Sequence, residues 1–195
     1  MASPARINYK IYQGSTWSEV LHWESDTKVY KPITAITKSA PVVVTAVAHG
    51  APVGWRVKFT NILGMTELNS DTAYHFVTDK TTDNLTVNSI NSLAYTTYVS
   101  GGIVEYNLPV DLDGYTARMQ IRPEVDSSEV IYELTTENGD IVIDNVLKTI
   151  TLTIPAESTA TFTFETAVYS LEMINGGQVT PLIGGGVILV KEVTR

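Results

Sequence analysis

Three histidines, His22, His49 and His75, are the side chains of this 195-residue chain best suited to metal binding or to proton transfer near neutral pH. A metal or catalytic site would need two of them to converge with carboxylates, and their spacing matches no ligand motif. His22 is expected in a strand of one domain, whereas His49 and His75 fall in another. His49 precedes Gly50, where a hydrogen bond that stabilises a turn is the simpler role. We interpret all three as structural.

Two pairs of aspartates invite a chemical interpretation. Asp111 and Asp113 resemble the start of a calcium loop, but Arg122 occupies the position of the bidentate glutamate that would close it. A turn before a strand is the favoured role for this pair. Asp140 and Asp144 flank a short apolar strand, and nothing in the sequence places them in a pocket where paired carboxylates could cleave a glycosidic bond. The sequence predicts neither a metal site nor a catalytic site.

The sequence supports neither nucleophilic catalysis nor the binding of a cofactor. Ser158 and Thr159 lack the Gly-x-Ser-x-Gly context of a nucleophile elbow. The glycines at 184–186 are followed neither by the Lys-Ser/Thr of a phosphate loop nor by a helical pattern, so a tight bend or bulge between two strands is favoured. Cysteine is absent, which excludes disulfides and thiolate ligands and fits a reducing cytosol. We expect a protein without cofactors that is not an enzyme.

Charge and hydropathy limit the partners. The net charge is -8 with a pI near 4.8, and no basic stripe is visible, so nucleic acid is not expected to bind. No apolar run approaches the roughly 20 residues that span a bilayer, and the residues at 1–6 lack the apolar core of a signal peptide. The sequence therefore predicts a protein that does not insert into a membrane.

Alternation with period two predicts strands along most of the chain. Buried rows are expected at Tyr115, Ala117, Met119 and Ile121, at Ile150, Leu152 and Ile154, and at Ala167, Tyr169, Leu171 and Met173. The segments 137–140 and 175–177 carry tight-turn residues between such runs. One short helical turn is expected at 155–161, where Pro155 suits a first turn. Many short strands separated by turns are typical of a sandwich or barrel.

Aromatic side chains are the remaining candidates for a functional role. Trp17, Trp23 and Trp55 are each expected in a core or, if exposed, as an anchor for a partner. Trp55, beside a turn, is the best candidate for exposure. Tyr95 and Tyr98, together with Tyr106, could form a contact surface for protein or carbohydrate, although packing within a barrel is favoured. Trp55, Tyr95 and Tyr98 are therefore the candidate interaction residues.

The chain reads as one domain inserted into another. Residues 36–106 contain five short candidate strands joined by connectors rich in Asn, Asp, Thr and Gly, which predicts a small β-barrel module. Prolines at 32, 41 and 109 restrict the backbone at both of its edges. Residues 1–35 and 107–195 are expected to form the discontinuous host domain. The predicted fold class is all-β, with an immunoglobulin-like β-sandwich host interrupted by the small barrel.

Several short motifs mark the 36–106 segment. They are Ala48-His49-Gly50, Gly64-Met65-Thr66-Glu67-Leu68-Asn69, Tyr95-Thr96 and Ser100-Gly101-Gly102, with Val57, Tyr74, Val77 and Leu85 between them. In these motifs the segment resembles a small β module found in phage tail and fibre proteins, which is often labelled after the first-catalytic-cysteine-half domain of ubiquitin-activating enzymes. Many such modules have Asp-Gly before the second strand and Leu-Asn-Gly later. Here Val53 and Ser70 replace the aspartate and the last glycine.

A second set of motifs lies in the flanking segments. They are Gly14-Ser15-Thr16 with Trp23, the stretch from Val110 to Arg122, Tyr169-Ser170-Leu171-Glu172, Leu182-Ile183-Gly184-Gly185 and Val193-Thr194-Arg195. In these the flanks resemble the N-terminal domain of phage upper baseplate proteins, although many relatives have Asp where Ser170 stands. Together the two resemblances cover nearly the whole chain. They imply a virion component of the tail or baseplate.

Three functional hypotheses follow, in order of preference. The first is a non-enzymatic structural component of a bacteriophage virion, at the tail, baseplate or fibre-attachment apparatus, assembled in the host cytoplasm. It would dock on other virion proteins by surface complementarity and form homo-oligomers in a symmetric ring. The second is a receptor-recognition protein that binds host-surface carbohydrate. The third, much weaker, is a hydrolase of cell-wall or capsule sugar that uses Asp140 or Asp144.

Overall fold

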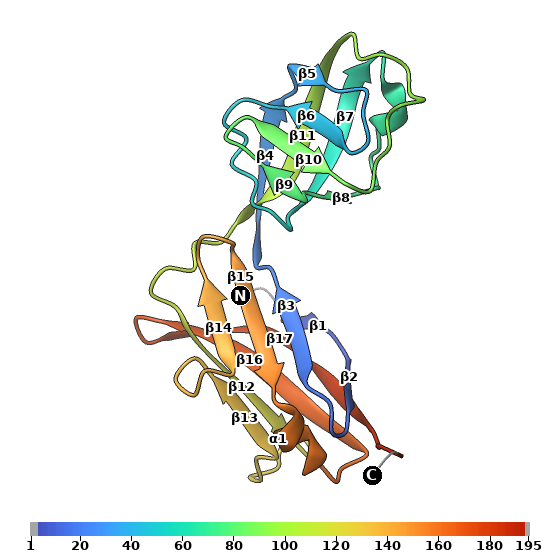
Figure 1. Cartoon of the computed structure of the whole chain (residues 1–195). Helices are drawn as coiled ribbons and strands as arrows, with labels where there is room; N and C mark the ends of the chain where they lie inside the picture. Colours follow the sequence, from blue (N-terminus) through green and yellow to red (C-terminus); the bar gives the residue numbers. More distant parts are fainter. Residues whose placement is uncertain (1–3, 194–195) are drawn as a thin grey trace. The chain divides into compact units, whose positions relative to one another are not determined.

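The structure, a computed structural model, describes residues 4–193 and divides the chain into two compact units (Figure 1). Of the described residues, unit 1 contains 4–21, 112–145 and 149–193, and unit 2 contains 22–111 and 146–148. Strands dominate both units, so the predicted all-β fold class is confirmed. Residues 1–3 of the N-terminal segment, and Thr194 and Arg195 of the last motif, lie outside the described residues.

Unit 2 is longer than the predicted 36–106 module. Strand β4 (Glu24–Pro32) pairs in antiparallel register with β11 (Ser100–Pro109), from Pro32 opposite Ile103 to Glu24 opposite Pro109. Residues 22–35 and 107–111, which the sequence analysis assigned to the host domain, therefore fold with unit 2. His22 also belongs to unit 2 and precedes β4, so its predicted place in a host strand is wrong.

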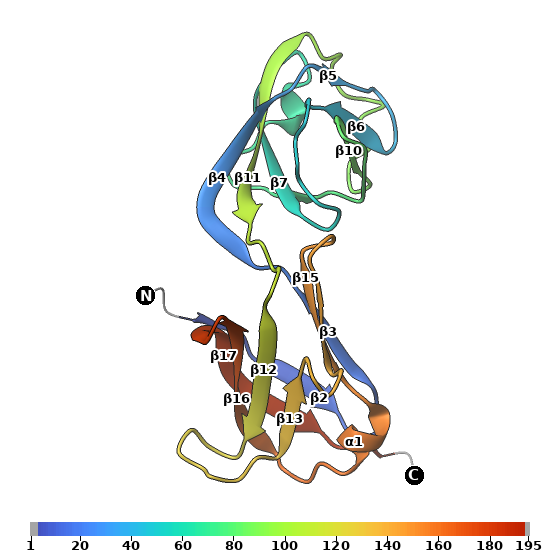
Figure 2. The same ribbon diagram turned by 90° about the vertical axis from the view of Figure 1, so that its left-hand side faces the viewer.

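Unit 1 is a sandwich of two sheets, which Figure 2 shows as separate layers. The larger sheet has the order β1-β17-β16-β12-β13, with β2 also pairing with β17; the smaller has the order β14-β15-β3. The strands are β1 (Ala5–Arg6), β2 (Tyr9–Tyr12), β3 (Trp17–Leu21), β12 (Thr116–Arg122), β13 (Tyr132–Thr135), β14 (Ile141–Asp144), β15 (Thr149–Ile154), β16 (Thr166–Asn175) and β17 (Gln178–Val190). Helix α1 (Ala156–Ala160) follows Pro155 and confirms the predicted helical turn.

The core of unit 1 follows the predicted alternation. The apolar rows of β12, β15 and β16 are buried, whereas Thr116, Arg118 and Ser170 are exposed. Turn chemistry also agrees with the sequence at 175–177, where Gly176 and Gly177 both have positive φ and close the hairpin between β16 and β17. The turn at 137–140 instead carries the chain from β13 in one sheet to β14 in the other.

The glycines at 184–186 lie inside β17, not between two strands as predicted, but a β-bulge in the pairing of β17 with β16 falls beside them, between Pro181 and Ile183. The edge strands β1 and β2 run parallel to β17 on either side of Gly185. A Cβ atom at Gly185 would lie 1.9 Å from the carbonyl oxygen of Ile7. The missing side chain thus lets the edge strand pass close to the β17 backbone.

Unit 2 consists of two four-stranded sheets, β5-β6-β10-β9 and β4-β11-β7-β8 (Figure 1). Besides β4 and β11, its elements are β5 (Ala35–Ile36), β6 (Val42–Thr45), β7 (Arg56–Leu63), the 3₁₀ turn η1 (Thr66–Leu68), β8 (His75–Phe76), β9 (Asp79–Lys80) and β10 (Asn84–Val87). The small barrel expected for this segment is not closed. The outer strands β5, β8 and β9 have only two residues each, and across residues 4–193 no strand ladder joins one sheet to the other.

The motifs of unit 2 stabilise its irregular segments. Gly64 has a φ of 91°, and a Cβ atom there would lie 2.3 Å from the Thr97 carbonyl oxygen. Glu67 accepts hydrogen bonds from the backbone and hydroxyl of Thr96 at 2.7 and 3.0 Å. Asn69 bonds both backbone groups of Ile62, accepting at 2.8 Å and donating at 2.9 Å. These residues hold the loops around η1 and before β11 in place of ladder pairing.

Candidate docking surface

Trp55 is buried, so its predicted exposure is wrong. It directly precedes β7 and is buried with Val57 and Phe59, leaving 1% of its surface exposed. Its indole N–H donates to the Asn107 carbonyl at 2.8 Å, and its ring meets His22 edge-on with centroids 5.2 Å apart. The side chain therefore links β7 to β11 within unit 2 and is not an anchor for a partner.

Tyr95 and Tyr98 are half-buried and pack against the core of unit 2, while Tyr106 is 3% exposed. The Tyr98 hydroxyl lies 3.1 Å from the Ile33 carbonyl and 2.9 Å from the Gly101 carbonyl. The favoured interpretation of these tyrosines as packing residues is confirmed. Tyr95 and Tyr98 keep part of their surface exposed, so a contact role for them stays a prediction, whereas Trp55 is buried.

The histidines have structural roles. His49 is buried, and its Nδ1 accepts the Ala51 backbone N–H at 3.1 Å, which leaves Nε2 to donate to the carbonyls of Thr81 and Asn84 at 3.0 and 3.2 Å. This confirms the predicted turn-stabilising hydrogen bond. Burial lowers the pKa of His49 and that of His75, which stacks on Phe59.

The aspartates do not converge on one another. The Asp111 carboxylate lies 3.2 Å from Nζ of Lys148 in unit 2. Asp140 accepts a hydrogen bond from the Tyr132 hydroxyl at 2.8 Å in unit 1. Within residues 4–193, no group of three or more His, Asp or Glu side chains could hold a metal ion. In the same range, no helix is long and apolar enough to cross a membrane.

A different surface stands out on unit 2: the outer face of the β4-β11-β7-β8 sheet, on which three exposed aromatic rings lie. Tyr30, Tyr74 and Phe76 are 57%, 41% and 61% exposed, and we call them the aromatic face. Strand register puts Tyr30 and Phe76 on one side of the sheet, and the Tyr74 ring lies beside Arg56 and Lys58 on that side. Tyr30 pairs with Glu105, Glu105 with Lys58, and Phe76 with Arg56.

Charged side chains hold this surface together. The Glu105 carboxylate bonds to Nζ of Lys28 and lies 3.3 Å from Nζ of Lys58. Arg56 forms a two-pronged ion pair with Glu24, with both N–O distances 2.6 Å. The guanidinium of Arg56 and the ammonium of Lys58 lie 5.0 and 5.8 Å from the centre of the Tyr74 ring, within range of a cation–π interaction.

The electrostatics agree with this arrangement. Hydrogen bonds from Lys28 and Lys58 hold the pKa of Glu105 below its ordinary value, and the bond to Glu105 raises the pKa of Lys28. The pKa of Arg56 is raised mainly by its hydrogen bond to Glu24. The polar groups are thus charged and paired near neutral pH, while the aromatic rings beside them remain open to solvent.

This arrangement suits the binding of another macromolecule. Tyr, Phe and Arg are enriched in protein–protein interfaces, where such side chains often contribute most of the binding energy. Sequence reasoning did not identify the aromatic face. The available signal was the pair Tyr74 and Phe76 flanking His75, since in a strand the first and third residues share one side.

Comparison with known proteins adds no relative. No model of a known protein family matches the chain, and no curated protein matches it at a significant level.

Proposed function

We propose that this protein is a non-enzymatic structural component of a bacteriophage virion, in the tail, baseplate or fibre-attachment apparatus, and that it docks on a neighbouring virion protein through the aromatic face. The motif resemblances of both units support the virion context. The observation that carries docking is the exposure of Tyr30, Tyr74 and Phe76 on one sheet face. Exposed rings of this size are costly in water unless a partner covers them.

The charge network supports a preorganised surface. Lys58 and Glu105 are largely covered by their neighbours, and Arg56 is fixed by Glu24, so the polar part of the surface is already ordered. The side chains of this surface would therefore lose little conformational entropy when a partner covers the aromatic face. In a ring-shaped assembly the same face would be used once per copy.

The test is made on particles of the phage that encodes the chain. We expect mass spectrometry of purified particles to detect the protein, and electron cryo-microscopy to place ordered copies in a ring or at a fibre root. Its absence from purified particles would refute the proposal.

The role of the aromatic face is tested by Phe76→Ser and Tyr30→Ser in the phage genome. Both side chains are more than half exposed, so the variants should fold, and we expect their incorporation into particles to fall severalfold. Leu93→Ser is the matched control, because Leu93 is 59% exposed and lies outside this face. Equal incorporation of all three variants would exclude the aromatic face as the docking surface.

Carbohydrate binding remains the competing function, because exposed aromatic rings also stack on sugars. A glycan array probed with the isolated protein separates the two. Binding of a bacterial surface polymer that Phe76→Ser abolishes would replace docking with receptor recognition.

A further inference from the structure

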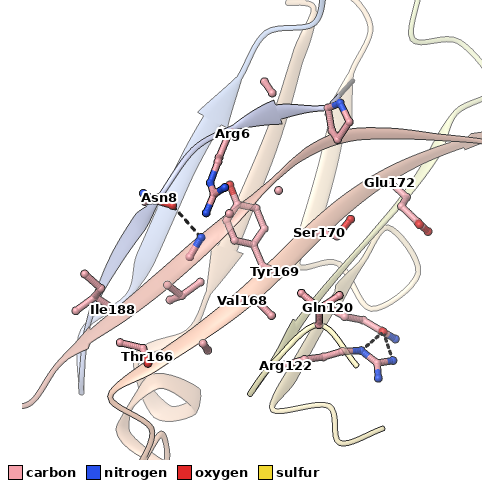
Figure 3. A pocket seen from close by; sticks show the side chains of 18 of the residues that line it. Arg6, Asn8, Gln120, Arg122, Thr166, Val168, Tyr169, Ser170, Glu172 and Ile188 are labelled. Carbon is pink, nitrogen blue, oxygen red and sulfur yellow. Dashed lines mark hydrogen bonds between the residues drawn. The ribbon is translucent and has the colours of Figure 1, made fainter. Parts of the chain in front are cut away.

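The outer surface of the larger sheet of unit 1 is hollowed into an open trough with a volume of about 980 Å³ (Figure 3). Strand register explains its form. In the middle of the sheet Ser170 pairs with Gly184, and Val168 pairs with Gly186, so small side chains make the floor. Longer side chains rise on both sides: Arg118, Gln120 and Arg122 from β12, and Arg6 and Asn8 from the β1–β2 edge.

The width of the trough suits one extended chain. The row from Gln120 through Ser170 and Gly184 to Arg6 crosses four neighbouring strands. With strands about 4.8 Å apart, the two walls are about 14 Å apart at their backbones. After the wall side chains have filled part of that distance, the remaining space fits a single extended segment better than a helix of about 10–12 Å diameter.

The trough concentrates positive charge on an acidic unit. The described part of unit 1 has five basic residues, and three of them line the trough: Arg6, Arg118 and Arg122, the others being Lys10 and Lys191. Among the described residues of the lining, one carries a carboxylate: Glu172, which pairs with Arg118 at 2.6 Å.

Among residues 4–193, the other two arginines have no carboxylate partner. Arg122 is held by the side-chain oxygen of Gln120, with N–O distances of 3.1 and 2.6 Å, and by the Ser127 carbonyl. Neither partner neutralises its charge. Arg6 forms no ion pair within residues 4–193. Figure 3 shows Arg6 and Arg122 on opposite sides of the strands that form the floor.

We propose that this trough binds an extended, carboxylate-rich segment of a partner protein. Each guanidinium can hold a carboxylate with two parallel hydrogen bonds, so carboxylates of one segment could reach Arg6 on one wall and Arg122 on the other. Two exposed apolar side chains, Val125 and Ile188, also line the trough and provide apolar contacts between the charges. The inference goes beyond the proposed function and does not depend on it.

A protein segment fits this lining better than an acidic polysaccharide. Tyr169 is the one aromatic residue of the lining, and it is 5% exposed, with its hydroxyl bonded to the Ile7 carbonyl at 2.9 Å. The trough therefore offers no open ring on which a sugar could stack. The floor is also formed by the paired strands β16 and β17, over which an extended chain can lie lengthwise.

The test uses the full chain and a fluorescently labelled peptide of alternating Glu and Val, with binding measured by fluorescence anisotropy at low salt. We expect saturable binding that weakens as salt is added, because exposed charges are screened. The double variant Arg6→Gln/Arg122→Gln should weaken binding by about tenfold or more, since each loses a charge-assisted contact. The control Lys10→Gln/Lys191→Gln removes the same charge from unit 1 outside the trough and should change binding less than about twofold.

A second variant separates shape from charge. Ser170→Tyr fills the floor at an exposed strand position that tolerates an aromatic residue, leaves all three arginines in place, and should abolish binding. Three results would overturn the proposal: no binding of the peptide, equal weakening by the arginine and lysine pairs, or unchanged binding by Ser170→Tyr. Binding of polygalacturonate, but not of the peptide, would assign the trough to an acidic polysaccharide instead.

Discussion

The ammonium group of Lys58 lies 3.3 Å from a carboxylate oxygen of Glu105, and the two side chains are only 10% and 12% exposed. The pair lies under the aromatic face, where strands β7 and β11 place the two residues directly opposite one another. A buried charge that loses its partner is strongly destabilising, because it keeps its desolvation cost without the attraction. Unit 2 should therefore depend on this ion pair.

Glu105→Gln should lower the free energy of unfolding by about 2 kcal/mol, the contribution of a hydrogen bond to a charged group. The pKa of Glu105 is lowered by Lys28 and then Lys58, so its contribution is fully present above the ordinary glutamate value of about 4.3 and is lost as the pH falls through the lower folded value. Denaturant titrations at a series of pH values should show that acid lowers the free energy of unfolding less in the variant than in the unchanged protein. Asp26→Asn, an exposed change on β4, is the control, and an equal effect there would contradict the prediction.

The side chain of Asn69 substitutes for a neighbouring strand by bonding the N–H and the carbonyl of Ile62. Asn69→Asp should cost about 2 kcal/mol, because a carboxylate oxygen would replace the donor and face the Ile62 carbonyl. Asn88→Asp adds the same charge at an exposed position of unit 2 and should have little effect. Thermal unfolding followed by circular dichroism measures both, and similar melting temperatures for the two variants would refute this role.

Much of the strand pattern could be predicted because it is local. The buried rows of β12, β15 and β16 follow from alternation alone, since each strand has one face in a core. The boundary of unit 2 could not be predicted in this way. Only the pairing of Lys28 with Asn107 and of its neighbours along β4 and β11 shows that these segments belong together.

The candidate site was predicted less well, because exposure depends on which face of a sheet is left uncovered. Trp55 and Phe76 are both aromatic residues next to turns or in short strands. The sequence alone gives no reason to expect that one is buried and the other exposed. Trp55 faces the core beside Val57, whereas Phe76 lies opposite Arg56 on the outer side. The motif residues Gly64 and Asn69 have structural roles, because they determine the geometry of loops.

The free energy of unfolding of unit 2 should also fall as the pH is lowered below the ordinary histidine pKa, because of His49. Burial lowers its folded pKa below the ordinary value of about 6.5, so its contribution is complete above that value and is lost as the pH falls through the folded pKa. Protonation would place a hydrogen on Nδ1, which could then no longer accept the hydrogen bond from the Ala51 N–H. His49→Gln should therefore be less stable at neutral pH and less sensitive to acid.

The state of His49 can be measured directly by long-range ¹H–¹⁵N NMR. The hydrogen bonds predict a neutral ring with its proton on Nε2 that persists below the ordinary histidine pKa of about 6.5. Titration of this ring near its ordinary value, or a proton on Nδ1, would show that the buried geometry does not set its pKa.

Gly185→Ala should destabilise unit 1 by about 3 kcal/mol, near the upper range for overpacking. The added Cβ atom would meet the Ile7 carbonyl oxygen at 1.9 Å, and backbone cannot move aside as a flexible side chain would. Gly186→Ala is the matched control at the next position, where the nearest atom, Oδ1 of Asn8, lies at an ordinary contact distance of 3.4 Å. Hydrogen exchange locates the damage: the Ile7 N–H, which donates to the Gly184 carbonyl at 3.1 Å, should lose protection in the first variant and keep it in the second. Equal protection in both variants would mean that the edge strand does not need the bare backbone of Gly185.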